Sequence, residues 1–215
     1  MNAALVPVKA LAAGKSRLAG RLPSGAQGRL ALAMLGDVVE TLRASAELAA
    51  VVVVTPDPRV AEEAEGLGAE PLLREDPGLN AALDAGARHL AARGLDALLV
   101  VLGDVPGGRP EDVAQLFAAL RGLGGRGVVL APSRDGGTSA LLRAPWDAIP
   151  NRFGKDSAAA HREAARAAQL PFSELPLVSL AVDLDRVEDA EALCAASGAP
   201  RTRALLTDLG FGVRP

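Results

Sequence analysis

The chain has 215 residues, a formal net charge of −3 and a sequence pI near 5.5. With one Trp, four Phe and no Tyr, it lacks both the basic surface and the stacking rings of a nucleic-acid-binding protein. Its longest apolar runs, such as 48–54 and 97–102, are too short to cross a bilayer, and no secretory signal precedes Lys9 and Lys15. The lone Cys194 excludes an intramolecular disulfide. We therefore expect a cytoplasmic protein without a membrane or nucleic-acid partner.

Short apolar runs alternate with longer helical patterns along the chain. The predicted strands are 3–8, 50–55, 69–73, 96–102, 126–131, 138–143 and 179–184, and the predicted helices are 25–45, 57–66, 79–93, 110–121, 157–168, 187–197 and 200–208. Continuously apolar runs such as VVVV at 51–54 are typical of parallel strands covered on both faces. The predicted fold class is therefore α/β, with a mostly parallel central sheet flanked by helices in one domain, 1–215. A looser excursion is expected at about 132–157, where Pro, Gly and Arg accumulate.

The loop after the first predicted strand, VPVKALAAGKSRLAGRLP (6–23), combines small residues with positive charge. Residues 12–14 are small enough for a ligand to approach the backbone, and Lys9, Lys15 and Arg17 bring cations to it. A triphosphate needs both features, because its charge must be neutralised and its oxygens must accept hydrogen bonds. The spacing matches neither the P-loop motif nor the dinucleotide motif G-x-G-x-x-G. The loop is a candidate for triphosphate binding, and a solvated basic loop is the alternative.

Three aspartates lie near the ends of predicted strands. Asp104 follows the fourth strand, and Asp183 and Asp185 flank Leu184 at the end of the seventh. The two-residue period of a strand places Asp183 and Asp185 on one face, and ligand sites of parallel sheets lie at the carboxyl ends of the strands. Carboxylates gathered there need a cation, and Mg²⁺ takes one or two carboxylates together with water and ligand phosphates. We expect one Mg²⁺ site, with Mn²⁺ as an alternative metal. In the competing interpretation, Asp185 caps the following helix and Asp104 is a turn residue.

Two later segments, SRDGGTSALL and NRFGKDSAAAH, have the composition of an anion site. In the first, Gly137 offers a backbone amide and Thr138 a hydroxyl. In the second, Gly154 precedes Ser157, which we predict to be the N-cap of an Ala-rich helix. The free amides of a helix N-terminus attract anions, and Lys155 adds positive charge there. A capped helix with a flexible entry is the alternative interpretation.

Taken together in chain order, these segments resemble the 2-phospho-L-lactate guanylyltransferase family of coenzyme F-420 biosynthesis, with its phosphoenolpyruvate guanylyltransferase variants. Members of that family have a compact GT-A-like nucleotide-diphospho-sugar transferase fold. The segments that carry the resemblance are VPVKALAAGKSRLA (6–19), VVVVTPD (51–57), GLNAAL (78–83), LVVLGDVP (99–106), GGTSALL (136–142), RFGKDSAAAH (152–161) and VDLDRVEDA (182–190). No single motif is decisive, but the ordered set is specific and runs nearly from end to end.

The resemblance implies a metal-dependent nucleotidyltransferase. It would move GMP from GTP to a phosphorylated three-carbon acid, 2-phospho-L-lactate or phosphoenolpyruvate, and release pyrophosphate. By resemblance, the metal ligands are Asp104, Asp183 and Asp185, and the catalytic residues are Asp104, Lys15 and Arg17. The nucleotide-binding residues are Val8, Lys9, Lys15, Arg17, Gly78 and Asn80, with Leu79 beside the last two. The acceptor-binding residues are Gly137, Thr138, Gly154 and Ser157. The excursion at 132–157 would then bind the acceptor.

Two positions depart from the family's common pattern. Ser139 follows Thr138 where Asn is common, and Gly103 precedes Asp104 where Ala is common. The first departure lies beside the expected acceptor site, so the acceptor stays open among 2-phospholactate, phosphoenolpyruvate and 3-phosphoglycerate. His161 lies one turn after Ser157 on the same helical face, and we expect it to pack or to orient the loop rather than to contact the acceptor.

The acceptor phosphate is already an anionic nucleophile, so the predicted chemistry needs no general base. Catalysis then consists of positioning and charge neutralisation. Three competing interpretations use the same residues: a sugar-phosphate nucleotidyltransferase, a GT-A glycosyltransferase, and a catalytically inactive paralogue that binds a nucleotide or a partner. The sequence leaves both monomer and homodimer open, and it is compatible with hand-off of a labile product to the next enzyme of the pathway.

Overall fold

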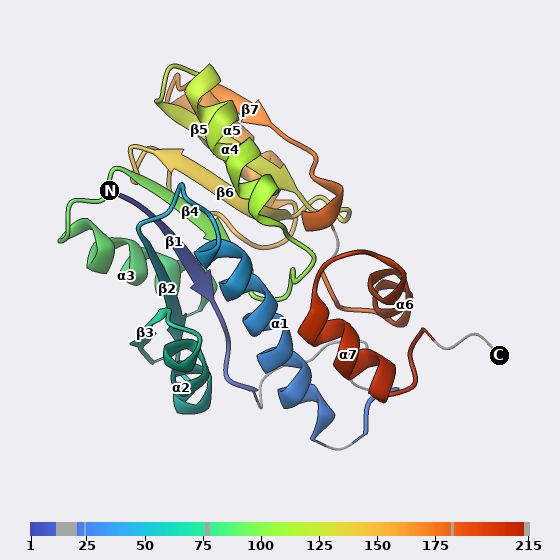
Figure 1. Ribbon diagram of the computed structural model, residues 1–215. Coiled ribbons are helices and arrows are strands. Elements are labelled where there is room, and N and C mark those ends of the chain that lie inside the picture. Colours follow the sequence, from blue (N-terminus) through green and yellow to red (C-terminus); the bar gives the residue numbers. More distant parts are fainter. Residues whose placement is uncertain (12–20, 24, 76–77, 182, 213–215) are drawn as a thin grey trace.

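The computed structural model describes residues 1–11, 21–23, 25–75, 78–181 and 183–212. Its centre is a seven-stranded sheet with the order β3-β2-β1-β4-β6-β5-β7 (Figure 1). The strands are β1 (Asn2–Pro7), β2 (Ala50–Thr55), β3 (Glu70–Leu73), β4 (Ala97–Val101), β5 (Gly127–Pro132), β6 (Thr138–Ala144) and β7 (Phe172–Glu174). β6 runs antiparallel to β4 and β5, and the other described pairs are parallel. The prediction of an α/β fold with a mostly parallel sheet is confirmed.

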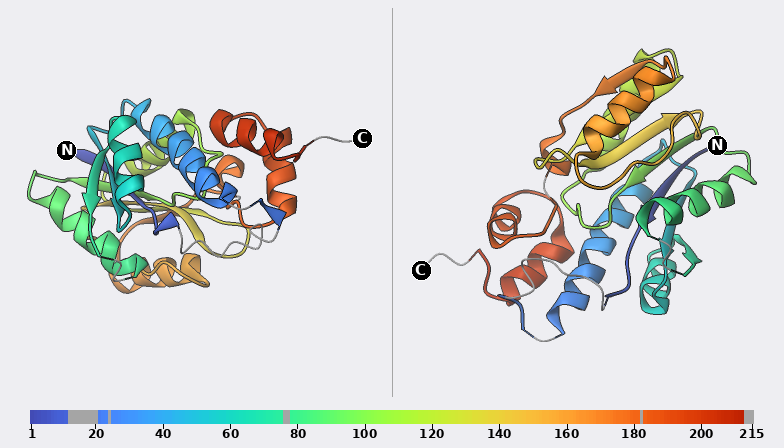
Figure 2. Two further views of the ribbon diagram at one scale, coloured as in Figure 1. Left: turned by 90° about the horizontal axis from the view of Figure 1, so that it is seen from below. Right: turned by 180° about the vertical axis from the view of Figure 1, so that it is seen from behind.

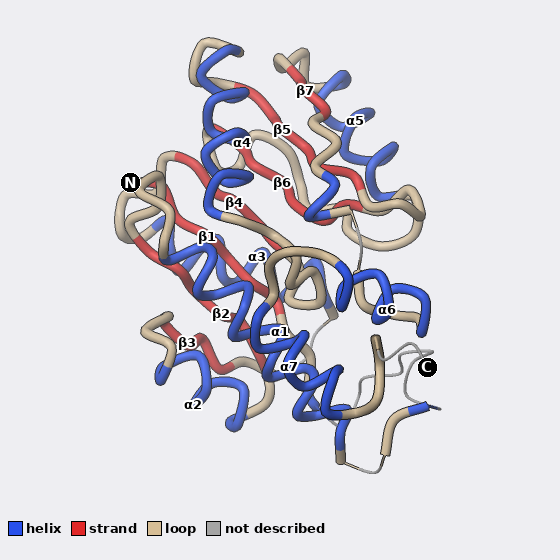
Figure 3. Tube along the Cα trace, turned by 45° about the vertical axis from the view of Figure 1, so that its right-hand side comes forward, coloured by secondary structure: helices blue, strands red, loops and turns tan. Residues whose placement is uncertain are grey.

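Helices cover both faces of this sheet. They are α1 (Ala26–Arg43), α2 (Pro58–Gly66), α3 (Leu79–Ala91), α4 (Pro110–Gly122), α5 (Ser157–Ala167), α6 (Val187–Ala195) and α7 (Pro200–Asp208), so all the predicted helices are present. Figure 2 shows α1, α2 and α4 on one face and α3 and α5 on the other. Figure 3 shows α7 beside α1, and α6 packs against α7. Within the described residues, we find no helix with the length and apolar character that a membrane span requires.

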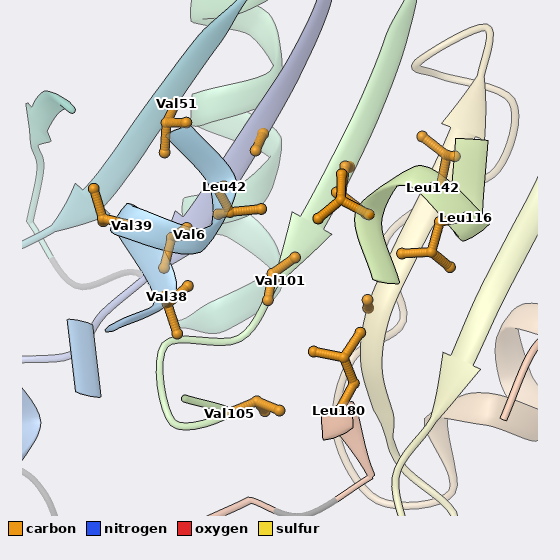
Figure 4. Close-up of a cluster of buried hydrophobic side chains, with 14 of the residues drawn as sticks. Val6, Val38, Val39, Leu42, Val51, Val101, Val105, Leu116, Leu142 and Leu180 are labelled. Atoms are coloured by element: carbon orange, nitrogen blue, oxygen red, sulfur yellow. The ribbon is translucent and has the colours of Figure 1, made fainter. Parts of the chain in front are cut away.

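The alternation of apolar side chains along the strands divides the core into two layers. On β1, Ala4 and Val6 face α1, α2 and α4, whereas Ala3 and Leu5 face α3 and α5. Figure 4 shows the first layer, where valines and leucines of the sheet meet those of the covering helices. In the second layer, a Cβ at Gly86 would lie 2.6 Å from the Cδ1 atom of Leu5. The glycine therefore lets α3 approach β1 closely.

The predicted strand at 179–184 is wrong. Val178–Leu180 is a 3-10 helix, and residues 183 and 184 belong to a loop. Leu180 and Leu184 are nevertheless buried, in two different apolar clusters. The apolar run thus reflects burial of a loop rather than strand pairing. The sheet gains instead the short strand β7, which pairs with β5 and was not predicted.

The strand order creates a crevice at one edge of the sheet. From β1 the chain passes to β2 on one side, and it returns to β4 on the other side of β1. The loops that follow β1 and β4 therefore diverge at the carboxyl ends of two neighbouring strands. Ligands of open α/β sheets bind at such switch points.

Candidate functional site

A cavity of about 350 Å³ opens at this switch point. Its walls come from the loop after β1, the ends of β2 and β3, the first half of α1 and the start of α3. The loop after β4 and the loop before α6 complete it, through Asp104 and residues 183–185. The described residues that line it include four carboxylates, Glu75, Asp104, Asp183 and Asp185, and two cations, Lys9 and Arg74. The described lining therefore carries more negative than positive charge, and a bound triphosphate would need added cations.

Asp104 lies in the turn that follows β4, and it is exposed toward the cavity. Desolvation, followed by the charge of Asp183, raises the pKa of Asp104 to about 6, while Lys9 acts in the opposite direction. A nearby cation would stabilise the ionised form of a carboxyl group whose pKa is raised in this way. Asp104 has the environment of a carboxylate that is completed by a positively charged ligand.

A single backbone hydrogen bond brings Asp183 and Asp185 close to Asp104. The N–H of Leu184 donates to the main-chain oxygen of Asp104 at 3.0 Å, and Asp183 and Asp185 flank this anchor. The predicted convergence of the three residues on one cavity is therefore present, although a loop and not a strand produces it. Asp185 is not the helix cap, because Arg186 is the N-cap residue of α6. Burial raises the pKa of Asp183, and repulsion from Asp135 and Asp189 adds to the effect.

The three carboxylates do not form a closed cage. Among the residues that the structure describes, no three carboxylate, imidazole or thiol groups are arranged to hold one metal ion. The donor set nevertheless fits a cation that takes one or two carboxylates and fills its other positions with water and ligand phosphates, as Mg²⁺ does. Three carboxylates alone would leave such a cation incompletely coordinated, so its remaining ligands would have to come from water and a bound phosphate.

The loop after β1 forms the opposite wall. Val8 and Lys9 line the cavity, and the N–H of Val8 donates to the main-chain oxygen of Val54 at 3.0 Å. Lys9 is exposed there. Lys15 and Arg17 lie outside the described residues, so their assignment to the triphosphate stays a prediction.

Asp57 anchors the start of this loop, a role that was not predicted. Its Oδ2 atom accepts from the N–H of Leu11 at 2.9 Å, and its Oδ1 atom accepts from the N–H of Arg59 at 2.9 Å. The second bond caps α2. Hydrogen bonding, first of all from Leu11, lowers the pKa of the Asp57 carboxyl. One carboxylate thus joins the cap of a helix to the wall of the cavity.

Replacing Asp57 with Ala should therefore affect both stability and binding. We expect loss of the cap to reduce the free energy of unfolding by about 1 kcal/mol, and loss of the Leu11 anchor to weaken nucleotide binding. Asp57→Asn is the matched control, because its amide keeps one oxygen that can still cap the helix. Thermal unfolding with and without GTP measures both effects. An Ala variant that loses stability but binds GTP normally would contradict the anchoring role.

At the start of α3, the two predicted nucleotide contacts Gly78 and Asn80 have different surroundings. Leu79 lines the cavity, and Gly78 precedes it with a φ of 92°. The side chain of Asn80 instead holds the backbone of Phe153: its Nδ2 donates to the main-chain oxygen at 3.0 Å, and its Oδ1 accepts from the N–H at 2.8 Å. Asn80 therefore links the turn beside the cavity to the segment that precedes Gly154. Direct nucleotide contacts by Gly78 and Asn80 stay a prediction.

The predicted acceptor residues lie together beyond this link. The Ser157 hydroxyl donates to Thr138 Oγ1 at 3.1 Å, and the N–H of Ser157 donates to the main-chain oxygen of Gly154 at 3.2 Å. Ser157 is not the N-cap of α5, as was predicted; Asp156 takes that position in the left-handed conformation. The hydroxyl bonds across to β6 instead. The amide of Gly137 donates to Asp135 Oδ1 at 3.0 Å.

Two contacts connect this cluster with the cavity, although its residues do not line the cavity itself. The N–H of Arg134 donates to the main-chain oxygen of Ala181 at 3.0 Å, which ties the Gly137 loop to the segment that leads to Asp183. Asn80 provides the other connection, through Phe153. One of the two contacts thus reaches the chain next to the cavity aspartates, and the other reaches the start of α3.

A shift in strand register sets the direction of the side chains at the start of β6. β5 pairs Ala131 with Ala140 but Pro132 with Thr138, so Ser139 has no register partner on β5. Such bulges redirect side chains and occur next to functional sites. Ser139 is buried, and its hydroxyl has no hydrogen-bond partner among the described residues. Ser139, which departs from the family's common pattern, therefore places a buried hydroxyl beside Thr138.

The fold is of the nucleotide-diphospho-sugar transferase type. A solved structure of a putative nucleotide-diphospho-sugar transferase from Desulfovibrio desulfuricans G20 superposes with a TM-score of 0.76, at 21% identity over 96% of this chain and 94% of that one. The chain belongs to the family described as guanylyl transferase CofC like, which matches residues 2–215.

Two curated relatives differ in the acceptor that their names state. The phosphoenolpyruvate guanylyltransferase of Sphaerobacter thermophilus is 42% identical over 191 residues, which cover 88% of this chain and 91% of the relative. The 3-phospho-D-glycerate guanylyltransferase of Phenylobacterium zucineum is 37% identical over 214 residues, which cover 97% of each. Both names describe guanylyl transfer to a phosphorylated three-carbon acid, so the family keeps the reaction while the acceptor varies.

Proposed function

We propose that this protein transfers GMP from GTP to phosphoenolpyruvate, releases pyrophosphate and serves coenzyme F-420 biosynthesis in the cytoplasm. The observation that carries the proposal is the family match over residues 2–215. The three aspartates and Lys9, which the resemblance assigns to the site, line the switch-point cavity and support the proposal. Phosphoenolpyruvate is chosen because it appears in the names of relatives that are 42% and 43% identical. The competing acceptors are 3-phosphoglycerate, which the name of a relative at 37% identity states, and 2-phospho-L-lactate, which the resemblance implies.

The proposed chemistry is positioning with charge neutralisation. A phosphate of the acceptor attacks the α-phosphorus of GTP, a new P–O bond forms, and pyrophosphate leaves with the electrons of the broken P–O bond. Mg²⁺, or Mn²⁺ in its place, would supply positive charge between Asp104 and the phosphates, with Asp183 or Asp185 as a second ligand. Lys9, Lys15 and Arg17 would neutralise the triphosphate, and the acceptor cluster would hold the attacking anion.

Pyrophosphate release tests the proposal directly. The protein is incubated with GTP, Mg²⁺ and one acceptor at a time: phosphoenolpyruvate, 2-phospho-L-lactate, 3-phosphoglycerate, L-lactate or a hexose 1-phosphate. We expect turnover with phosphoenolpyruvate and none with L-lactate, because a site built to bind a phosphate strongly rejects an analogue that lacks it. Parallel reactions with ATP, CTP and UTP measure the base preference. Efficient transfer to the hexose 1-phosphate alone would replace the proposal with a sugar-phosphate nucleotidyltransferase.

Lys15→Ala tests the triphosphate loop. Loss of one charge-assisted contact is expected to weaken GTP binding by about 1.5–3 kcal/mol, which corresponds to roughly 10- to 150-fold in Kd. Titration of GTP by calorimetry measures the change. Arg126→Ala is the control for loss of one exposed cation, because Arg126 is exposed before β5 and does not line the cavity. Unchanged Kd and unchanged turnover in Lys15→Ala would remove Lys15 from the site.

A further inference from the structure

The hydrogen bonds of His161 fix the position of its proton. The N–H of Arg152 donates to His161 Nε2 at 2.9 Å. A main-chain amide can only donate, so Nε2 must accept, and the neutral ring carries its proton on Nδ1. His161 Nδ1 lies 3.1 Å from Thr138 Oγ1. The Nδ1–H therefore donates to the threonine hydroxyl.

This assignment leaves the Thr138 hydroxyl only its own proton for a further hydrogen bond. Its oxygen accepts from His161 and also from the Ser157 hydroxyl, at 3.1 Å in each case. A hydroxyl has two lone pairs and one proton, so with Ser157 as the donor both acceptor positions are used and the Thr138 proton remains. Thr138, Ser157 and His161 are 2%, 1% and 0% exposed, so water does not compete freely for these bonds. The Thr138 hydroxyl is thus preset as a donor.

The surroundings of His161 keep its ring neutral and fixed, so that Nδ1–H stays the donor to Thr138. Burial, followed by the positive charges of Arg143 and Arg152, lowers the pKa of His161 to about 4, so the ring is neutral at neutral pH. The ring of Phe153 meets the imidazole edge-on, with a centroid distance of 4.9 Å and an interplanar angle of 69°. Asn80 holds the backbone of Phe153 on both sides. The imidazole therefore has one orientation and one tautomer.

We propose that His161 is a positioning residue that presents the Thr138 hydroxyl as a hydrogen-bond donor to an oxygen of the anionic acceptor. The proposal rests on the proposed function, because Thr138 belongs to the acceptor cluster. It assigns His161 a role through Thr138 and not through contact with the reacting atoms. A neutral histidine of the opposite tautomer would accept from Thr138 and would turn the hydroxyl oxygen, rather than its proton, toward the acceptor.

The tautomer can be measured without any catalytic reaction. In long-range ¹H–¹⁵N spectra of the ¹⁵N-histidine-labelled protein at pH 7, His161 is expected to show a protonated Nδ1 and an unprotonated Nε2. The chain has only one other histidine, His89, and His89→Gln assigns the two sets of signals. A protonated Nε2 on His161 would overturn the proposal, whatever the activity of the protein.

Steady-state kinetics test the link to the acceptor. His161→Phe keeps a ring beside Phe153 but removes both hydrogen bonds, and we expect it to raise the KM for phosphoenolpyruvate about tenfold or more, with little change in the Kd for GTP. His161→Gln retains an amide oxygen and an amide donor, so it should recover part of the loss. His89→Gln is the matched control, because His89 pairs with Glu70 on the outside of α3 and should leave both constants unchanged.

A double-mutant cycle separates positioning from a merely structural role, and it remains informative if His161→Phe does not fold. If His161 acts through Thr138, then adding His161→Gln to Thr138→Val should raise the acceptor KM little beyond Thr138→Val alone. Additive effects of the two changes would overturn the proposal, and so would equal weakening of GTP and acceptor binding by His161→Gln. If the unmodified protein transfers GMP to no acceptor, the proposed function and the acceptor role both fail, whereas the tautomer is still decided by the spectra.

Discussion

Asp104→Asn is expected to reduce turnover by about 10³-fold or more while making the ligand-free protein more stable above pH 6. The two effects have one cause. Asp104 lies close to Asp183 and Asp185 in the cavity, and without a cation its charge is unfavourable. Asparagine removes that repulsion, and it also removes the charge that would hold a metal and the triphosphate. Function and stability should therefore change in opposite directions.

The sign of the stability effect follows from the pKa. The pKa of Asp104 is raised from 3.8 to about 6, so the folded state binds this proton more tightly than the unfolded state does. Ionisation then costs stability as the pH rises from about 4 to about 6, and the full cost is present above pH 6. Because the residue is exposed toward the cavity, solvent screening limits the difference to about 1 kcal/mol.

Chemical unfolding in EDTA at pH 4 and pH 7 measures this difference between the protein and Asp104→Asn. The variant should gain stability relative to the parent at pH 7 and little at pH 4. Asp208→Asn, at the exposed end of α7, is the control for loss of one carboxylate elsewhere. A variant that is inactive and also less stable at pH 7 would show that Asp104 supports the fold rather than the site.

The sequence predicts the framework of this site because local patterns determine it. Helical periodicity and continuous apolar runs indicate which segments are helices and which are strands, and ligand sites of parallel sheets lie at the carboxyl ends of the strands. Lys9 and Asp104 are located by that rule alone. The strand order that places the loops after β1 and β4 at the switch point comes from the structure. Thr138 and Ser157 are found by composition and by family resemblance, and the structure brings their hydroxyl groups to 3.1 Å.

The remaining features depend on single tertiary hydrogen bonds, for which a sequence has no periodic signal. Asp183 reaches Asp104 through one bond to the Leu184 amide, and not through strand alternation. Asp57 looks like an ordinary helix cap, and its second oxygen reaches Leu11 only in the folded chain. Ser157 has the residue type and position of a cap, but its hydroxyl bonds to Thr138 once β6 lies beside α5. In each case a contact distant in sequence decides the role of a locally ordinary residue.

His161 is expected to make the protein lose stability as the pH falls from about 6.5 to about 4. Burial and two neighbouring arginines lower its pKa from 6.5 to about 4, so between these values the unfolded state binds the proton more readily than the folded state. The stability from the neutral ring is therefore fully present above pH 6.5 and is lost as the pH falls toward 4. Full linkage corresponds to about 3 kcal/mol.

Urea unfolding at pH 7, 5.5 and 4 measures this loss in the protein and in His161→Gln, which cannot titrate in the range. The free energy of unfolding should fall less steeply in the variant, by about 3 kcal/mol over the whole interval. Acidic groups that titrate near pH 4 contribute equally to both proteins and cancel in the difference. Parallel curves for the parent and His161→Gln would mean that His161 is protonated as easily in the folded chain as in the unfolded one, and a neutral ring could then not set the direction of the Thr138 hydroxyl.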